Sequence, residues 1–302
     1  MFIIKNKKIF IGLSVVLVVL SIISISVFGL KIGIEFKGGA LIEVLYDEAR
    51  PSQEAVNESL NALGYGSILV QPTGELGYIV KSRDLTDTEH NLVLHTLTQN
   101  GANTLQQVNF NSIGPSVGKE LTRKAIIAIV LVSLAIVFFI AYAFRKVSKP
   151  VSSWRYGFIA IITLLHDVII PVGIFAALSH YFGAEVDTLF VVAILTILGL
   201  SVSDTIVIFD RVRENLNKQS KISITSFSNT IGSSLEQSFV RSISTSMTVI
   251  LVLLALVFFG PDSTKYFALM LTAGMFFGTY SSIFLASPLL VLVQEWQDKK
   301  SK

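Results

Sequence analysis

Two carboxylates lie inside apolar stretches of the sequence, where charged side chains are rare. Asp204 belongs to the apolar run that begins at Thr188, about six residues before the charged cluster at Asp210. Asp167 lies in another apolar run, four residues before Pro171. A charge at mid-span in a membrane costs on the order of 2.5 to 3.5 kcal/mol, so such residues are functional candidates by default. Carboxylates in this setting could take up and release an ion.

A basic residue in the next apolar stretch could act on Asp204. Arg241, Thr245 and Thr248 are spaced i, i+4 and i+7, which predicts one shared helix face. Antiparallel neighbouring helices with level ends would bring Arg241 near Asp204 or Asp210. A guanidinium beside a buried carboxylate favours the ionised form, and its removal favours the protonated form. We therefore expect Asp204 and Arg241 to form an ion relay, with Asp167 as a secondary candidate.

Simpler interpretations of these residues stay open. Arg241 could be an interfacial anchor whose long side chain reaches the membrane surface. Asp204 and Asp167 could be structural hydrogen-bond acceptors between helices. Because adjacent helix positions differ by about 100°, we do not expect His166 and Asp167 to share a face, and His166 is interpreted as a packing or water-facing group. A Gly274 and Gly278 pair predicts a face for close helix packing.

The elements that must hold these residues are membrane spans. The 302 residues are 52% hydrophobic and only 15% charged, a composition typical of an integral membrane protein. Apolar runs of roughly 20 residues are long enough to cross the hydrocarbon core. Six such runs are predicted, at residues 9–29, 125–144, 156–179, 188–209, 242–259 and 266–293.

The distribution of basic residues predicts the orientation of the spans. Most basic residues outside the spans fall on one side of the predicted membrane. The two short loops on the other side are poor in them: residues 180–186 contain no Lys or Arg, and residues 260–265 contain only Lys265. Both termini are therefore expected in the cytoplasm, with residues 1–30 as a retained signal anchor. The basic residues of the expected cytoplasmic side are Lys5, Lys7, Lys8, Arg145, Lys146, Lys149, Arg155, Arg211, Arg213, Lys218, Lys221, Lys299, Lys300 and Lys302.

The hydrophilic segment between the first two spans, residues 31–123, has the pattern of a small α/β domain. Residues 51–63 and 85–98 are predicted helices, and they alternate with strand-like segments near 31–45, 67–71, 78–82 and 104–111. Two helices among four strands favour a ferredoxin-like sandwich. The predicted fold is thus a polytopic α-helical membrane protein with one exported ferredoxin-like domain, followed by spans two to six within residues 124–302.

Several chemistries are disfavoured by the sequence. There are no cysteines, which excludes disulfides, thiolate metal sites and cysteine nucleophiles. His90 and His95 are five residues apart and do not match the i, i+4 spacing of a helical metal pair. The formal charge of +3 reflects basic residues at span ends rather than a nucleic-acid surface. We expect neither a cofactor nor a bound metal.

Six motifs, in order along the chain, resemble those of one known family. They are GIEFKGG at residues 33–39, VG at 117–118, LHD at 165–167, VSDTIVIFDRVREN at 202–215, RSISTS at 241–246 and GTYSSIF at 278–284. The resemblance that they carry extends over nearly the whole chain. The sequence resembles the SecF family of bacterial protein-export membrane subunits, which belongs to the resistance-nodulation-division (RND) superfamily.

The resemblance implies a function and a set of partners. A SecF subunit is one six-span half that pairs with SecD in the bacterial cytoplasmic (inner) membrane. The pair associates with the SecYEG translocon, often with YajC and near YidC, and pulls polypeptide outward after the ATPase SecA has pushed it in. The proton-motive force drives this work, so the transported ion is H⁺, with Na⁺ as the alternative. Such a subunit is an accessory to translocation and not an enzyme. The family's relay residues fall on Asp204 and Arg241.

Two positions depart from the family pattern. Glu35 and Ser203 replace an aspartate and an asparagine, respectively, and Ser203 adjoins the relay carboxylate.

Three other functions are alternatives. One is a purely structural assembly subunit of the translocon. Another is an intramembrane aspartyl protease using Asp167 and Asp204, which lacks the Gly-x-Gly-Asp pattern. A self-sufficient small-molecule exporter would need twelve spans.

Overall fold

The computed structural model describes residues 2–66, 68–99, 101–143, 153–218 and 224–300. Within these ranges the chain forms two compact units. The first, here called the sheet domain, comprises residues 32–126; the second, the membrane unit, comprises residues 1–31 and 127–302. Phe144 and five basic residues used to predict the orientation lie outside the described residues; these five are Arg145, Lys146, Lys149, Lys221 and Lys302.

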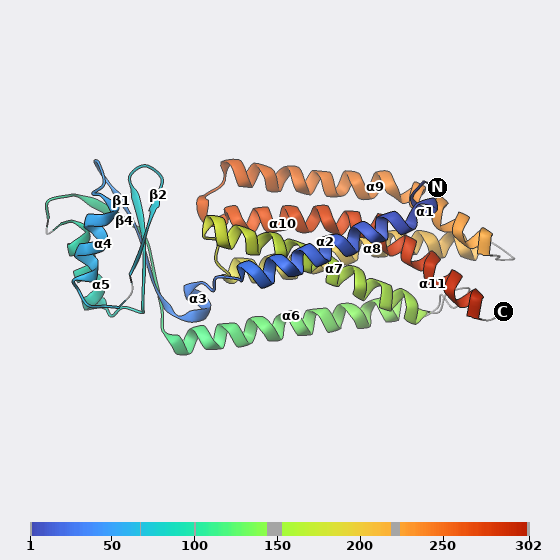
Figure 1. Cartoon of the computed structure of the whole chain (residues 1–302), viewed down its shortest axis with the longest axis horizontal. Helices are drawn as coiled ribbons and strands as arrows, with labels where there is room; N and C mark the ends of the chain where they lie inside the picture. The colour runs from blue at the N-terminus through green and yellow to red at the C-terminus, as the bar shows by residue number, and fades with distance from the viewer. Residues whose placement is uncertain (1, 67, 100, 144–152, 219–223, 301–302) are drawn as a thin grey trace. The chain divides into compact units, whose positions relative to one another are not determined.

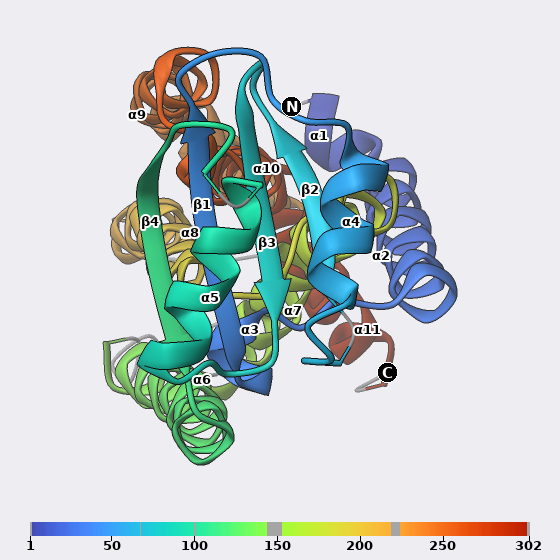
Figure 2. The same ribbon diagram turned by 90° about the vertical axis from the view of Figure 1, so that its left-hand side faces the viewer.

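The sheet domain is a four-stranded antiparallel sheet with two helices on one face, as Figure 2 shows for α4 and α5. The strand order is β2-β3-β1-β4, and every neighbouring pair is antiparallel. With this order the β-α-β-β-α-β succession is the ferredoxin-like topology, so the predicted domain fold is confirmed. The elements are α3 (Ile34–Lys37), β1 (Gly39–Tyr46), α4 (Gln53–Asn61), β2 (Leu69–Thr73), β3 (Gly77–Ser82), α5 (Asp87–Leu97) and β4 (Leu105–Ile113).

Local sequence signals set the limits of the two helices. The Ser52 side chain accepts a hydrogen bond from the backbone N–H of Ala55 at the start of α4. Thr86 and Glu89 form a reciprocal capping box at the start of α5. The helices bury apolar residues against alternate positions of β1, among them Ile42 and Val44. The core of the domain thus lies between the helices and one face of the sheet.

Two glycines of the sheet domain allow a close backbone contact. Gly38 has a φ of +83°, and a Cβ there would lie 2.9 Å from the Cα of Pro115. A Cβ at Gly118 would lie 2.9 Å from the carbonyl oxygen of Phe36. Only glycine fits at both positions, because each would otherwise force backbone atoms apart. The N-terminal end of α6 (Pro115–Ala143) is thereby held against the segment before β1.

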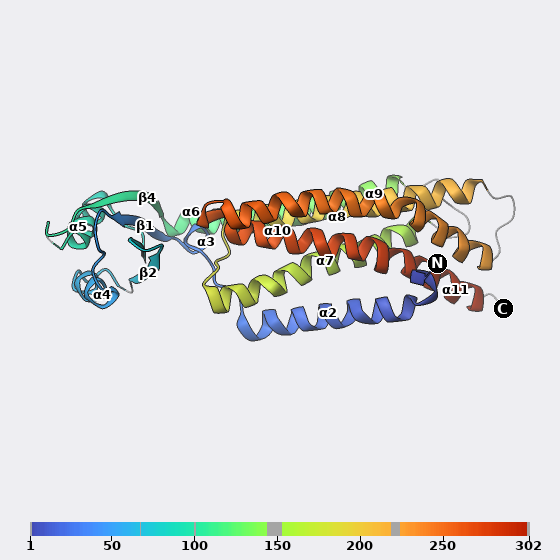
Figure 3. The same cartoon turned by 90° about the horizontal axis from the view of Figure 1, so that it is seen from above.

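Among the described residues, six helices are long and apolar enough to cross a membrane, as the sequence predicts. Figures 1 and 3 show the long helices of the membrane unit, with α2 alongside α7. A short helix, α1 (Phe2–Lys5), precedes them. The spanning helices are α2 (Lys7–Phe28), α6, α7 (Ser153–Phe182), α8 (Thr188–Asn217), α9 (Ile224–Phe259) and α10 (Asp262–Ser281), the last continuing through a π-helical turn η1 (Ser282–Ala286) into α11 (Ser287–Lys300).

The segment between the fourth and fifth predicted spans, residues 211–241, is largely helical among the described residues. α8 extends to Asn217 and α9 begins at Ile224. Phe227, Ile231 and Leu235 recur every four residues and are buried. This apolar stripe packs the start of α9 against its neighbours, which explains why polar residues on the other faces do not end the helix.

Glycines also determine how closely the spanning helices approach. A Cβ at Gly274 would lie 2.3 Å from a side-chain carbon of Ile197, and one at Gly278 would lie 3.3 Å from the Cβ of Ser201. The predicted Gly274 and Gly278 packing face is therefore confirmed, and its partner is α8. This approach brings the hydroxyl-rich end of α10 to the helix that carries Asp204.

Candidate functional site

Asp167 on α7 is fully buried and is held by donors from three helices. Its Oδ1 lies 2.8 Å from Nδ1 of His166. Its Oδ2 accepts hydrogen bonds from Ser281 Oγ of α10, at 2.7 Å, and from Ser201 Oγ of α8. A carboxylate inside a membrane protein needs such donors because no bulk water replaces them. Asp167 therefore joins α7, α8 and α10 at one point.

Asp204 on α8 is held more loosely. Its side chain is 9% exposed, and its Oδ2 lies 3.2 Å from Thr279 Oγ1 and 3.3 Å from Ser246 Oγ. Each of these hydroxyls also lies within 2.9 Å of a carbonyl of its own helix, and the two oxygens are 2.5 Å apart. A hydroxyl has only one proton to donate. The two hydroxyls therefore cannot satisfy the carboxylate, each other and both carbonyls at the same time.

This surplus of acceptors suits a carboxylate that changes its protonation state. When Asp204 is ionised, Thr279 and Ser246 can turn their protons toward it. When Asp204 is protonated, the same hydroxyls can return to the carbonyls of Met275 and Ser242. The exchange needs only rotation of hydroxyl groups and no movement of a helix.

The two carboxylates influence each other without touching. Their charges repel, although no hydrogen bond joins them among the described residues. A neighbouring hydroxyl pair, Thr205 and Ser282 at 2.8 Å, joins α8 to the π-helical turn. Aspartyl proteases instead share one proton directly between two carboxylates. The separate hydroxyl partners of Asp167 and Asp204 do not match that arrangement.

The structure does not bring Arg241 to Asp204. Arg241 is exposed, whereas Ser242 and Ser246 are buried on the face of α9 that meets α8. Arg241, Thr245 and Thr248 are all exposed, and the buried Ser242 and Ser246 face lies one residue, or about 100° of rotation, away from them. Hydroxyl residues occur on every side of this part of α9, so the sequence pattern alone could not select the face. The role of Arg241 in an ion relay stays a prediction.

His166 is a buried packing residue, which is one of its two expected roles, but it also contacts Asp167. His166 and Asp167 are adjacent, yet their side chains lie within hydrogen-bond distance. Their Cβ atoms do point in different directions, but the imidazole ring is long enough to turn back toward the carboxylate. His166 is 3% exposed, and its ring stacks parallel to that of Tyr280 with centroids 6.2 Å apart.

Sequence reasoning missed three hydroxyl partners of the carboxylates: Ser246, Thr279 and Ser281. Their signal was present, because several hydroxyl residues cluster within two apolar spans at residues 242–248 and 279–282. Hydroxyls at these depths are expected to bond across helices. The sequence could not show which hydroxyl bonds which carboxylate. Ser201, for example, lies on the same helix as Asp204 but donates to Asp167.

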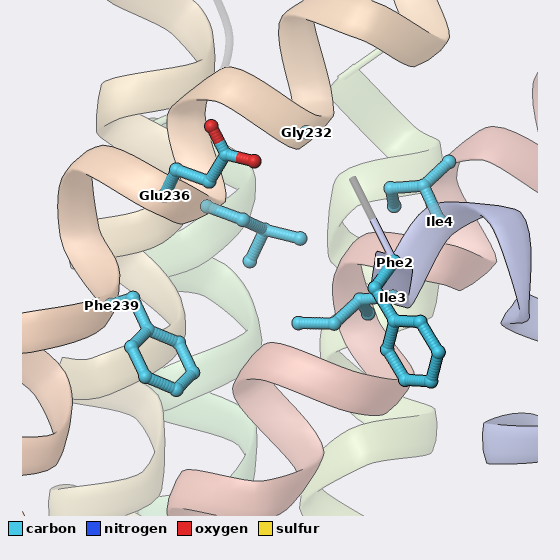
Figure 4. Close-up of a pocket in the computed structure, with 7 residues that line it drawn as sticks. Phe2, Ile3, Ile4, Gly232, Glu236 and Phe239 are labelled. Carbon is cyan, nitrogen blue, oxygen red and sulfur yellow. The ribbon is translucent and has the colours of Figure 1, made fainter.

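A cavity of about 230 Å³ lies apart from this network, between α1 and α9 (Figure 4). None of its lining residues is a partner of Asp167 or Asp204. Apart from Glu236 the lining is apolar. It consists of Phe2, Ile3, Ile4, Gly232, Leu235, Glu236 and Phe239.

Comparison with known proteins identifies the family. The model of the C-terminal region of the protein export membrane proteins SecD/SecF matches residues 93–296, and the SecD/SecF GG motif matches residues 23–49. The chain belongs to the SecD/SecF family. The first match contains both carboxylates, and the second contains Gly38 and Gly39.

Individual relatives place the chain with the SecF members of the SecD/SecF family. It is 42% identical to the protein translocase subunit SecF of Thermobaculum terrenum over 98% of this chain and 94% of the relative. It is 35% identical to SecF of Anaerolinea thermophila over 98% of this chain and 96% of the relative. The chain is therefore a SecF-type subunit of protein export.

Solved SecDF structures share the fold. The crystal structure of SecDF, a translocon-associated membrane protein from Thermus thermophilus, matches 98% of this chain with a TM-score of 0.79 and 28% identity. A second SecDF structure, in a super-membrane-facing form, matches 99% of this chain with a TM-score of 0.68. The chain spans 38% and 39% of the length of those SecDF chains.

Proposed function

We propose that this chain forms one six-span half of a SecD–SecF unit, which uses the proton-motive force to assist Sec-dependent protein export across the bacterial cytoplasmic membrane. In this proposal both termini are cytoplasmic and the sheet domain is exported. The partners are SecD, the SecYEG translocon with its ATPase SecA, and the accessory proteins YajC and YidC. The substrate is unfolded polypeptide, and no cofactor is needed beyond the transported ion.

Asp204 is the ion-exchanging group of the proposal. The observation that carries the proposal is the weak hydrogen bonding of Asp204. Its partners, the hydroxyls of Thr279 and Ser246, can accommodate either protonation state of the carboxyl group. One elementary charge that crosses 100 mV of membrane potential releases about 2.3 kcal/mol. That amount corresponds to a shift of roughly 50-fold in a conformational equilibrium, which is enough to drive a domain rearrangement.

Asp167 and Arg241 have supporting roles in the proposal. Asp167 fixes the junction of α7, α8 and α10 and supplies a second negative charge that Asp204 senses. Arg241 would reach Asp204 only after α9 turned by about 100°, which would replace the Ser242 and Ser246 face by the Arg241 and Thr245 face. Such a turn would link ion binding to movement.

The test compares Asp204→Asn with Asp210→Asn in vesicles that contain the chain and its SecD partner. Asp210 is an exposed residue on the same helix and has a partner in Arg213, so its variant is a matched control. We expect Asp204→Asn to remove potential-dependent export and ion flux, while Asp210→Asn retains them. Unchanged potential-dependent export in Asp204→Asn would overturn the proposal.

Two further measurements separate the alternatives. If the chain is a purely structural assembly subunit, Asp204→Asn will retain export as long as the complex assembles, which co-purification measures. Replacement of Na⁺ by K⁺ at fixed pH distinguishes the ions. Export that persists without Na⁺ supports the proton, and export that stops supports sodium.

A further inference from the structure

The two buried carboxylates of the membrane unit are compensated either by a proton of their own or by a nearby positive charge. Asp167 and Asp204 are its buried acids, and His166 is the one buried basic side chain among the residues that the structure describes. Two ionised carboxylates close enough to repel one another are costly in a medium of low dielectric constant. A positive charge or a proton must therefore be held near them.

The geometry of His166 orients one of its nitrogens toward the carboxylate and leaves the other open. Nδ1 lies 2.8 Å from Oδ1 of Asp167, so a proton on Nδ1 is favoured there. Nε2 is buried and has no hydrogen-bond partner among the described residues. In the neutral ring this nitrogen is an acceptor, and in the charged ring it is a donor. Nε2 is thus the position at which the ring gains or loses its second proton.

The surroundings of the ring contain few other ionisable groups. On its own helix the ring faces Asp167, and from α10 it faces Tyr280, whose ring lies parallel to it. On α8 the buried acid is Asp204, whose charge interacts with that of Asp167. On the side of α2, the Tyr280 hydroxyl donates to the carbonyl of Phe10 and lies near the hydroxyl of Ser14. Among the described residues, no other basic side chain is buried beside these groups.

We propose that His166 is a proton-holding residue of the ion relay, with Nδ1 fixed by Asp167 and Nε2 as the exchanging position. Protonation of Nε2 gives an imidazolium that neutralises Asp167, so that Asp204 can ionise without a second uncompensated charge nearby. Loss of that proton makes ionisation of Asp204 unfavourable. His166 thus supplies, from inside this chain, the countercharge that Arg241 does not provide in this structure. This inference rests on the proposed ion exchange at Asp204.

The direct test observes the ring itself in the complete complex with the SecD partner. The chain has four histidines, so ¹⁵N-histidine labelling gives few signals, and His166→Gln identifies the one that belongs to His166. With spectra recorded from about pH 5 to about pH 8, we expect Nδ1 to stay protonated throughout, while the Nε2 signal changes with pH and changes differently in Asp204→Asn. A ring that stays neutral throughout this range would overturn the inference.

The functional test uses a matched pair of variants on one helix. His180 is exposed on α7, where its ring stacks on Phe28, and it is distant in sequence from the carboxylates. We expect His166→Gln to lower potential-dependent export by roughly 100-fold and to flatten its pH profile. His180→Gln should leave both unchanged. Equal amounts of assembled complex, measured by co-purification, separate this effect from misfolding.

The two possible failures give different results. If His166→Gln keeps the normal pH profile while Asp204→Asn abolishes potential-dependent export, the role of His166 is wrong and the proposed function stands. If Asp204→Asn also retains export, the proposed ion exchange itself is wrong, and with it the inference about His166.

Discussion

The sheet domain and the membrane unit bury different kinds of side chain. In the sheet domain the core is apolar, with residues such as Val44 and Leu60 between the sheet and its helices. Its polar contacts, such as the pair of Arg83 and Glu89, lie at the surface. The membrane unit buries serines, threonines, Asp167 and Asp204 instead, and exposes large apolar residues such as Phe258 and Phe259.

The solvent explains the contrast. Water pairs with the polar surface of a soluble domain and excludes its apolar groups, whereas lipid tails do the reverse. Burial of a polar group therefore serves different ends in the two units. In the sheet domain the buried hydroxyl of Tyr46 bonds the carbonyl of Leu97 and so contributes to stability. In the membrane unit buried polar groups join the helices and also provide the candidate for ion exchange.

The largest loss of stability expected from this comparison is that of the variant Asp167→Leu. The variant leaves Ser201 and His166 without this acceptor, whereas Ser281 keeps the carbonyl of Gly278, and each unsatisfied buried group costs about 1 to 3 kcal/mol. We expect a loss of about 3 kcal/mol or more in the stability of the membrane unit, measured by thermal unfolding in detergent. Asp167→Asn, which keeps one acceptor oxygen, should lose less. Equal stability of the two variants would contradict the hydrogen-bond pattern described for Asp167.

Ser281→Ala should have a smaller effect. It removes one donor to the Asp167 carboxylate, and a hydrogen bond to a charged group contributes about 1.5 to 3 kcal/mol. The loss should fall near the lower limit, because Ser201 and His166 remain. Thr245→Ala, an exposed hydroxyl on α9 that bonds only its own helix, is the matched control. If Thr245→Ala lowers thermal stability more than Ser281→Ala does, the hydrogen bond from Ser281 of α10 to Asp167 is contradicted.

Tyr46→Phe tests the corresponding buried hydroxyl of the sheet domain. The Tyr46 hydroxyl donates a buried hydrogen bond of 2.9 Å to the carbonyl of Leu97, and its loss should cost about 1 kcal/mol. Burial raises the pKa of Tyr46 from 10.0 to about 12. Because the folded-state pKa is raised, the stabilisation is complete below pH 10.0 and is lost as the pH rises toward about 12. Circular dichroism should show this alkaline loss in the natural chain and not in Tyr46→Phe, while export is unaffected by the variant.

The smallest effect expected concerns the surface of the sheet domain. The Arg83 guanidinium and the cap at Thr86 lower the pKa of Glu89 from 4.5 to about 2. Because this folded-state pKa is depressed, the stabilisation is present above pH 4.5 and is lost as the pH falls toward about 2. Arg83→Ala should bring the Glu89 pKa back toward its usual value, measured by NMR of ¹³C-labelled glutamate. A Glu89 pKa that stays near 2 in this variant would show that the cap alone is responsible.

The sequence was sufficient where a pattern repeats over many residues. The number of spans followed from the length of the apolar runs, and the ferredoxin-like domain followed from alternating helix and strand signals. The packing role of Gly274 and Gly278 followed from a spacing that has a direct steric meaning. Each of these inferences rests on periodicity or size, which a sequence shows directly.

The sequence was insufficient where a single rotation or contact decides the outcome. Hydroxyl residues lie on every side of the middle of α9, so nothing in the pattern favoured the Ser246 face over the Arg241 face. The contact between His166 and Asp167 depends on how two side chains turn, which helix geometry does not determine. The hydroxyl partners of Asp167 and Asp204 come from helices far apart in the sequence, and their pairing depends on depth and tilt.

The π-helical turn η1 has a consequence for how this region can evolve. A π-turn holds one more residue per turn than an α-helix and corresponds to a one-residue insertion within an α-helix. Loss of one residue between Ser282 and Ala286 would restore a regular helix and leave α10 and α11 in their present alignment. A deletion anywhere else in these spans would turn every following side chain by about 100°. Single-residue length variation among related chains is therefore expected to be tolerated best at this turn.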